Sequence, residues 1–184
     1  MLAQRLDELS FTTIEALVAA GLREGRTLDF KRDPVGGRDE DKRKFLADVS
    51  AFANTAGGDL LYGVEESGGE ATAAPGVALD DPDAEIRRLD GVLRAGLDPR
   101  LPTVDLRWLP GPNGRGCLIV RVPRSFLAPH RVVFRDHAKF YGRNSAGKHP
   151  LDVTELRAAF LSADGLVQSI RRFRQDRLGL IEAG

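Results

Sequence analysis

The sequence predicts an α/β (α+β) fold in which a mixed sheet is flanked by helices, with an additional helix at the C-terminal end. Three observations support this fold class. Residues 27–64 read as a strand, a helix and a second strand in succession. Residues 104–122 read as two strands joined by a turn rich in proline and glycine. Beyond Gly165, apolar residues recur at helical spacing on a basic segment.

The first two predicted elements are a helix and a strand. Apolar residues at helical spacing predict a helix from Ser10 to Ala20, which ends before Gly21. Residues 27–31 alternate polar and apolar side chains, so we expect a strand with one face toward solvent.

The next helix and strand complete the strand–helix–strand unit. Asp39 is a capping residue for a helix that ends at Gly57-Gly58, where glycine permits the left-handed turn. Asn54 and Thr55 are expected to hydrogen-bond the last carbonyls of this helix, and residues 60–64 form a buried strand. The residues expected on the inward face of the helix are Phe45, Leu46, Val49 and Phe52.

The second half of the chain alternates further helices with strand pairs. Asp81-Pro82 begins a helix, because an aspartate cap precedes a proline in the first turn. Asp152 and Glu155 match a capping box that opens another helix, which extends through Leu161. The expected strands are residues 104–109, 117–122, 132–134 and 139–141.

Composition limits the classes of function. With 27 basic and 27 acidic residues the formal net charge is zero, so any nucleic-acid binding requires a local basic patch. The single cysteine, Cys117, argues against a disulfide or a cysteine-based zinc site, and the three histidines lack zinc-ligand spacing. No apolar run approaches the ~18 residues that span a bilayer. Acidic residues occur too early for a signal peptide, and we therefore expect a cytoplasmic protein.

Acidic residues lie beside both strands of the strand–helix–strand unit. Glu24 and Asp29 bracket the start of the first strand, and Glu65 with Glu66 follows the second. Functional sites collect at strand ends in such units, and three carboxylates there suit Mg²⁺ or Mn²⁺. Such an ion activates water or stabilises a leaving oxygen in phosphodiester cleavage. The alternative interpretation is that these acids are solvated turn residues.

A loop near the C-terminal end fits the pattern of a phosphate-binding loop. Residues 142–148 match G-x-x-x-x-G-K. His149 stands where a metal-binding serine or threonine is needed, and Pro150 removes a backbone N–H. The loop also follows a hairpin strand and does not open a strand–helix–strand unit, so we expect no ATP binding.

Basic residues suggest contacts with nucleic acid. Tyr141, Arg143 and Lys148 offer an aromatic ring and positive charge to a phosphate or a stacked base. The alternative for them is a solvated hairpin end. Lys31 and Arg32 follow Asp29 closely and are also candidates for phosphate contact; their alternative is an ion pair with a neighbouring carboxylate.

Four segments, in this order, resemble the Schlafen AlbA-like domain family. The resemblance extends from about residue 22 to about residue 161. The most specific segment is AFANT-x-GG-x-L-x-x-GV at residues 51–64. The segments are Glu24 with Leu28-Asp29-Phe30-Lys31, then residues 51–65, then residues 120–125 with Pro129, then residues 140–145.

The resemblance implies an α/β lobe that binds nucleic acid, of a type common in bacterial regulators and defence proteins. Vertebrate members join two lobes that hold tRNA-like RNA, and some cleave RNA with a metal-bound trio of carboxylates. By motif position this trio falls on Glu24, Asp29 and Glu65 (or Glu66). Asp29 stands where glutamate is usual and Glu65 where aspartate is usual. The chain also lacks the cysteines of the vertebrate zinc site.

We expect three parts: an N-terminal helix at residues 1–21, the AlbA-like domain at residues 22–161, and a basic amphipathic helix at residues 162–184. Because one lobe supplies half of the two-lobed groove that the resemblance implies, we expect a homodimer, with the last helix as its contact. The alternative for this helix is the stub of a longer protein. The expected function is binding of DNA or RNA. The alternatives are a metal-dependent endoribonuclease acting on tRNA-like RNA and a non-catalytic protein-interaction or sensor scaffold. The sequence leaves open whether the chain is an enzyme.

Overall fold

The computed structural model of the chain describes residues 1–162 and residue 173. Its central sheet contains the two strands of the predicted strand–helix–strand unit, which pair parallel with Leu28 opposite Asp59 and Lys31 opposite Tyr62. The remaining strands of this sheet pair antiparallel, and the strand order is β1-β2-β8-β5 with β7 also on β8. The elements are β1 (Leu28–Lys31), α2 (Asp39–Ala53), β2 (Gly58–Tyr62), β5 (Val77–Ala78), β7 (Asp105–Pro110) and β8 (Arg115–Val122).

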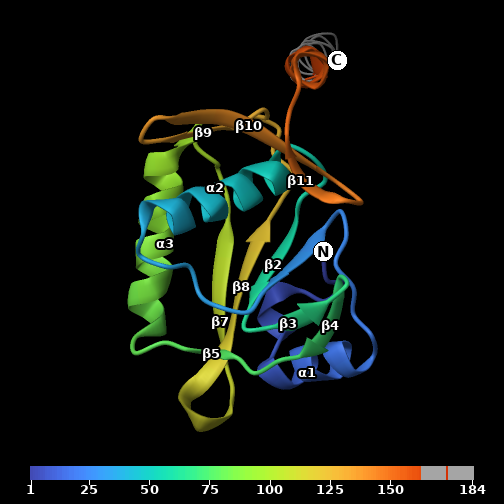
Figure 1. Cartoon of the computed structure of the whole chain (residues 1–184), viewed down its shortest axis with the longest axis vertical. Helices are drawn as coiled ribbons and strands as arrows, with labels where there is room; N and C mark the ends of the chain where they lie inside the picture. The colour runs from blue at the N-terminus through green and yellow to red at the C-terminus, as the bar shows by residue number, and fades with distance from the viewer. Residues whose placement is uncertain (163–172, 174–184) are drawn as a thin grey trace, which may run out of the picture.

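A second sheet crosses α2 at the top of the molecule (Figure 1). Its strand order is β11-β10-β9-β6, and all its pairs are antiparallel. The predicted hairpin is confirmed, but its register differs: residues 132–134 pair with 137–139, because the chain turns tightly at Arg135, whose φ is 55°. The elements are β6 (Leu97–Asp98), β9 (Arg131–Phe134), β10 (His137–Asn144) and β11 (Gly147–Pro150).

The remaining elements cover the sheets. The predicted helices at residues 10–20 and from Asp81 are confirmed: Ser10 and Asp81 each cap their helix by accepting a hydrogen bond from a first-turn N–H. A small hairpin of β3 and β4, closed by Gly68-Gly69, was not among the predicted elements. The elements are η1 (Leu6–Glu8), α1 (Phe11–Ala19), β3 (Glu65–Ser67), β4 (Glu70–Ala73), α3 (Pro82–Gly96) and η2 (Pro112–Gly114).

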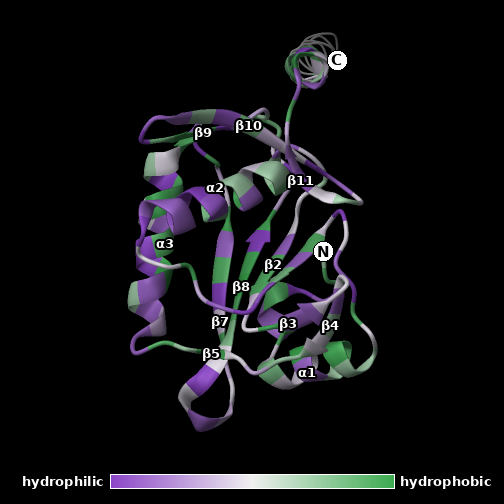
Figure 2. Ribbon diagram, in the orientation of Figure 1, coloured by the Kyte–Doolittle hydropathy of each residue, from purple (hydrophilic) through white to green (hydrophobic). Residues whose placement is uncertain are grey.

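Each face of the central sheet carries its own hydrophobic cluster. Strand residues alternate between faces, so Leu60 points toward α2 and α3 while Leu61 points toward α1. Phe45, Phe52 and Leu89 pack on the first face. Figure 2 shows hydrophobic residues along β2 and β8, the two strands that contribute alternate residues to both clusters. The predicted mixed α/β fold is confirmed.

The last described helix begins at residue 153 and follows the predicted capping box. The backbone N–H of Glu155 donates to Asp152 Oδ1 at 2.8 Å, and the N–H of Asp152 donates to Glu155 Oε2 at 2.9 Å. Of the basic helix predicted at residues 162–184, only Ser162 and Phe173 are among the described residues, and the rest of this prediction lies outside them. The homodimer contact assigned to it stays a prediction.

Candidate functional site

A cleft of about 710 Å³ opens beside β1. Its walls come from β1, the start and middle of α2, the loop at residues 33–36, the turn between β3 and β4, and the β10–β11 turn. The lining contains five basic and five acidic residues, so the cleft is balanced in formal charge. These are Arg23, Lys31, Lys44, Arg143 and Lys148, and Glu24, Asp29, Asp33, Asp41 and Asp48.

Asp29 lies at the inner side of the cleft and is only 5% exposed. Alternation along β1 turns its side chain to the face that also carries Leu60 and α2. Arg143 Nη2 donates to Asp29 Oδ1 at 2.9 Å, and Lys31 Nζ donates to the other oxygen. Burial by itself would raise the pKa of the Asp29 carboxyl, but Lys31 and Arg143 hold this pKa below its ordinary value. Asp29 is therefore an ionised, doubly paired carboxylate.

Arg143 connects the β10–β11 hairpin to the start of β1. Besides Asp29, its guanidinium donates to the carbonyls of Gly25 at 3.0 Å and Leu28 at 3.3 Å. It also lies 4.8 Å from the centre of the Phe52 ring, which suits a cation–π contact. Arg143 is only 6% exposed, and its guanidinium is occupied by these contacts within the chain. Its role in the structure is to fix the hairpin that forms one wall of the cleft.

Glu24 and Lys31 are the charged groups nearest to Asp29 that remain partly exposed. Glu24 Oε1 accepts a hydrogen bond from the backbone N–H of Phe30 at 2.7 Å. Burial raises the pKa of the Glu24 carboxyl, and the charge of Asp29 raises it further, against the opposite effect of the Phe30 N–H. Burial lowers the pKa of Lys31, but the carboxylates of Asp48, Asp29 and Glu24 more than reverse this. Lys31 is thus a firmly charged cation at the cleft.

Lys148 lines the opposite wall of the cleft. Its Nζ lies 2.7 Å from Oδ1 of Asp48, a nearly buried residue of α2. The same Nζ lies 5.9 Å from the centre of the Tyr141 ring. Lys148 therefore joins three features: the cleft, a buried carboxylate and a partly exposed aromatic ring.

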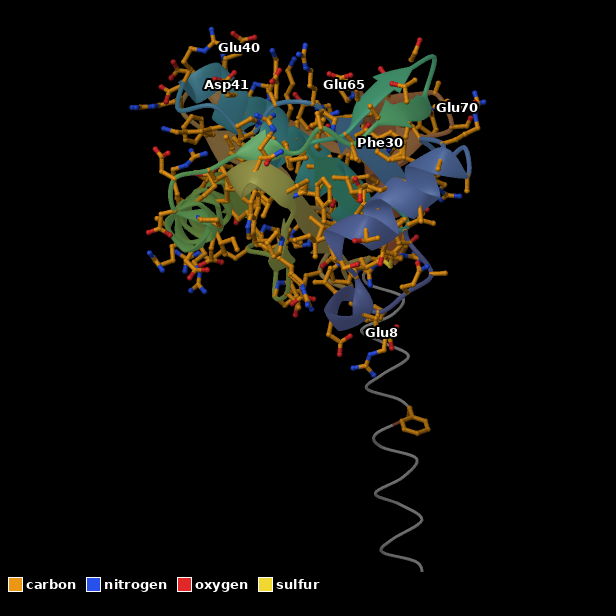
Figure 3. The ribbon with its side chains drawn as sticks, turned by 90° about the horizontal axis from the view of Figure 1, so that it is seen from below. Glu8, Phe30, Glu40, Asp41, Glu65 and Glu70 are labelled. Atoms are coloured by element: carbon orange, nitrogen blue, oxygen red, sulfur yellow. The ribbon has the colours of Figure 1, made fainter. Side chains whose placement is uncertain are left out.

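Glu65 lies apart from Glu24 and Asp29. It lines a neighbouring recess and pairs with Arg32 at 3.1 Å. Glu24 and Asp29, by contrast, both line the cleft, and Glu24 bonds the Phe30 N–H within β1. Figure 3 shows Glu65 near the surface, on the side where Glu40 and Asp41 of α2 also lie.

The proposed carboxylate trio therefore does not converge in this structure. Among residues 1–162 and 173, no group of three or more histidine, cysteine, aspartate or glutamate side chains is placed to hold one ion. As placed, Glu24, Asp29 and Glu65 do not fit a single metal centre. Divalent-ion binding by them stays a prediction.

The predicted nucleic-acid contacts fall into different environments. Lys31 and Lys148 line the cleft, whereas Arg32 lines the recess of Glu65, and Arg143 is buried. Ion pairs with carboxylates, the alternative for Lys31 and Arg32, are present for both. Tyr141 is partly buried on β10 beside Lys148.

Sequence reasoning missed the part that Asn54 plays. Thr55 does bond the helix carbonyl of Ala51, at 2.7 Å, but Asn54 reaches across to the second sheet. Its Nδ2 donates to the carbonyls of His130 at 3.0 Å and Tyr141 at 2.9 Å, and its Oδ1 accepts from the His130 N–H at 2.7 Å. This residue positions the aromatic strand against α2. The available signal was a polar pair closing an otherwise apolar helix.

Asp48 was also missed as a cleft residue. It interrupts the apolar face of α2 between Leu46 and Val49, both fully buried. A charged residue in such a position needs a partner, and Lys148, 100 positions later, supplies it. The irregularity was visible in the sequence, but the partner was not.

Comparison with known proteins gives one family. The family model described as "Schlafen, AlbA_2" matches residues 24–152. No protein with curated annotation matches the chain. Within the described residues, no helix is long and apolar enough to cross a membrane.

Two solved structures resemble the fold. The DIP2311 protein of Corynebacterium diphtheriae is 20% identical with a TM-score of 0.48, covering 77% of this chain and 26% of that one. The N-terminal domain of a protein related to the ATP-dependent DNA helicase RecG, from Nitrosomonas europaea, is 25% identical with a TM-score of 0.46. That match covers 63% of this chain and 74% of the other. The chain thus spans about a quarter of the first protein.

Proposed function

Because the chain belongs to the Schlafen AlbA_2 family, we propose that it binds nucleic acid, DNA or RNA, at the cleft and along its rim. The observation that carries this proposal is the position of Lys148. Its ammonium group lies at the cleft wall, 5.9 Å from the Tyr141 ring, so one small region offers a cation to a phosphate and a ring to a base. Lys31 supplies a second cation across the cleft.

The carboxylates that pair with the cations of the cleft do not prevent this binding. Lys44 pairs with Glu40, and Arg23 with Glu70, in contacts where all four side chains are about half exposed or more. Exposed ion pairs contribute about 0–1 kcal/mol, so a phosphate replaces such a carboxylate at little cost. Asp29 and Asp48 instead hold Lys31 and Lys148 in place. The neutral net charge predicts only a few phosphate contacts.

Binding of a fluorescent oligonucleotide, followed by anisotropy across a salt series, tests the proposal. We expect the logarithm of affinity to fall with the logarithm of salt concentration, by about 0.7–0.9 per phosphate contact. The variant Lys44→Ala/Lys148→Ala carries Asp48→Asn as well, so that no buried carboxylate loses its partner. It is expected to bind at least ~10-fold more weakly, with a slope smaller by about two.

Two controls accompany this variant. Asp48→Asn alone isolates the effect of the companion change. Arg87→Ala/Arg94→Ala removes two exposed cations from α3, a helix that does not line the cleft, and is expected to leave affinity within about twofold. Salt-independent binding, or an equal loss in the α3 variant, would refute a localised nucleic-acid site.

A second candidate function is cleavage of RNA in the same cleft. One observation favours it: Glu24 has a raised pKa beside Asp29, whose pKa is lowered, with Lys31 next to both. Carboxyl groups with pKa values pushed apart are typical of acid–base sites. Purified protein is incubated with tRNA with and without Mn²⁺, against Glu24→Ala/Asp29→Ala. Equal cleavage by both proteins would assign the activity to a contaminant.

The two assays also decide the third interpretation. If the chain neither binds oligonucleotides nor cleaves RNA, a protein-interaction or sensor module on this fold is favoured.

A further inference from the structure

The seam between α2 and β10 carries aromatic rings and cations that the cleft does not contain. Strand residues two apart share a face, so His137, Lys139 and Tyr141 lie in a row along β10 on the side of α2. Arg43 of α2 lies near this row: its charge acts on both His137 and Tyr141. Figure 1 shows β10 running across α2 at the top of the molecule. We call these four residues the seam.

The two rings of the seam form one extended surface. The planes of His137 and Tyr141 are 11° apart and their centres are separated by 5.9 Å. His137 Nε2 and the Tyr141 hydroxyl are hydrogen-bonded at 2.8 Å. Both residues are partly exposed, and Asn54 holds the backbone of Tyr141 by donating to its carbonyl. The rings are therefore fixed in orientation before any ligand arrives.

The cations of the seam differ from those of the cleft. Lys31 and Lys148 are paired with Asp29 and Asp48. Arg43 and Lys139 are exposed, and among residues 1–162 and 173 neither forms an ion pair. Because a phosphate that meets an unpaired cation displaces no carboxylate, these two side chains are the most available positive charges near the rings.

We propose that the seam binds single-stranded nucleic acid, with an unpaired base stacked on the His137–Tyr141 surface and backbone phosphates on Arg43 and Lys139. Stacking requires an open base face, which an internal base pair of a duplex does not offer. The strand continues from the seam into the cleft through Lys148, which contacts the Tyr141 ring and lines the cleft. This inference rests on the proposed function and specifies its substrate class.

The test compares one 12-nucleotide single strand with the duplex of the same sequence, by anisotropy at fixed salt. The native chain is expected to bind the single strand at least ~10-fold more tightly. His137→Ala/Tyr141→Leu is expected to lose about 5- to 100-fold for the single strand, the range that removal of a stacking ring gives, and less than twofold for the duplex. Tyr141→Phe keeps the ring and should retain most of the affinity.

A spectroscopic signal separates stacking from a structural effect. A 2-aminopurine base placed in the strand is quenched when it stacks, so its fluorescence is expected to fall on binding to the native chain and Tyr141→Phe. The fall should be smaller with His137→Ala, which keeps the Tyr141 ring, and absent with the double variant. Arg43→Ala/Lys139→Ala keeps both rings and should lower the salt slope by one to two. Thermal unfolding of each variant confirms that it is folded.

The outcomes distinguish this inference from the proposed function. Equal affinity for the single strand and the duplex, or quenching that survives loss of both rings, would refute single-strand binding at the seam. The proposed nucleic-acid binding would still stand. Absence of salt-dependent binding to either ligand overturns both. Should the double variant not fold, His137→Ala, which leaves the Tyr141 ring in place, decides: quenching equal to that of the native chain would exclude stacking on His137.

Discussion

The aspartates of two buried aspartate–arginine pairs lie on neighbouring strands of the central sheet and on opposite faces of it. Asp59 of β2 pairs with Arg121 of β8, and Asp29 of β1 pairs with Arg143 of β10. Each arginine also donates to two backbone carbonyls: Arg121 to those of Leu2 and Gln4, and Arg143 to those of Gly25 and Leu28. In both pairs, one guanidinium fastens a distant segment to the sheet.

The surroundings of the two pairs differ. Asp59 is fully buried, and its oxygens are satisfied by Arg121 at 2.8 and 3.0 Å and by the Leu2 N–H at 2.6 Å. Asp29 has additional charged neighbours, Lys31 and Glu24, and borders the cleft. A buried acid is therefore weak evidence for function here. What indicates function at Asp29 is the presence of Lys31 and Glu24, charged groups that the Asp29–Arg143 pair does not require.

The largest expected effect comes from the Asp59–Arg121 pair, which we call the closed pair because Asp59 is fully buried. Arg121→Ala leaves the carboxylate of Asp59 buried without its counter-ion, so we expect a loss of about 3–5 kcal/mol in the free energy of unfolding. Urea denaturation measures it. Nucleic-acid affinity of the folded fraction should not change, because Arg121 lies on the face away from the cleft.

A matched double variant sharpens this result. Asp59→Leu/Arg121→Met removes both charges together and should recover most of the lost stability. A loss below about 1 kcal/mol for Arg121→Ala would mean that the pair does not hold the N-terminal segment to the sheet, contrary to what its geometry indicates.

The Asp29–Arg143 pair, which we call the cleft pair, should respond differently when its arginine is replaced by alanine. Arg143→Ala removes the charged hydrogen bonds to Asp29, but Lys31 remains as a partner, so we expect a smaller loss of about 2–3 kcal/mol. The β10–β11 turn loses its attachment to β1, and nucleic-acid affinity should fall as well. Urea denaturation and anisotropy measure the two effects. A cost equal to that of Arg121→Ala with unchanged affinity would make the two pairs equivalent.

The part of the fold that sequence reasoning predicted rests on local signals. The apolar run at residues 60–64 and the glycines that close α2 identify the strand–helix–strand unit without reference to distant residues. The hairpin of β3 and β4 was missed because Glu65 looked like the end of the preceding strand. Gly63, with φ of 93°, turns the chain there and begins a new strand instead.

The candidate site was less predictable, because its contacts are long-range. Asp29 and Arg143 are 114 positions apart, and no spacing rule connects them. The sequence therefore assigned Asp29 to a metal and Arg143 to a phosphate, although the structure pairs the two with each other. Lys148, by contrast, lies on β11, just after the tight turn from Tyr141's strand, so its closeness to the ring was foreseeable from the sequence.

Lys31 distinguishes the cleft pair from the closed one most directly. In Lys31→Met, Asp29 keeps Arg143 and the apolar stem of the side chain is retained, so we expect stability to change by only about 1 kcal/mol. If Lys31 contacts a phosphate, the salt slope of oligonucleotide binding falls by about one. Lys31→Arg preserves the charge and should keep the native slope. An unchanged slope in Lys31→Met would restrict this lysine to pairing with Asp29.

The smallest effect, and the one most specific to the cleft, is the response of Glu24 to pH. Burial and the charge of Asp29 raise the pKa of Glu24 in the folded chain, so folding favours its neutral form. A group with a raised pKa contributes stability that is complete below its unfolded value, about 4.3, and is lost as pH rises through the folded value.

Glu24→Gln keeps an oxygen for the Phe30 N–H but does not ionise. We therefore expect a slightly higher Tm than that of the native chain at pH 7, and a difference that disappears as the pH falls below about 4. Thermal unfolding across pH 3–8 measures it. The closed pair offers the control, because Arg121→Ala leaves Glu24 and Asp29 untouched and should preserve the dependence on Glu24. A Tm difference that is constant with pH would show that Glu24 acts by shape or hydrogen bonding, and the surplus charge that separates the two pairs would then reduce to Lys31.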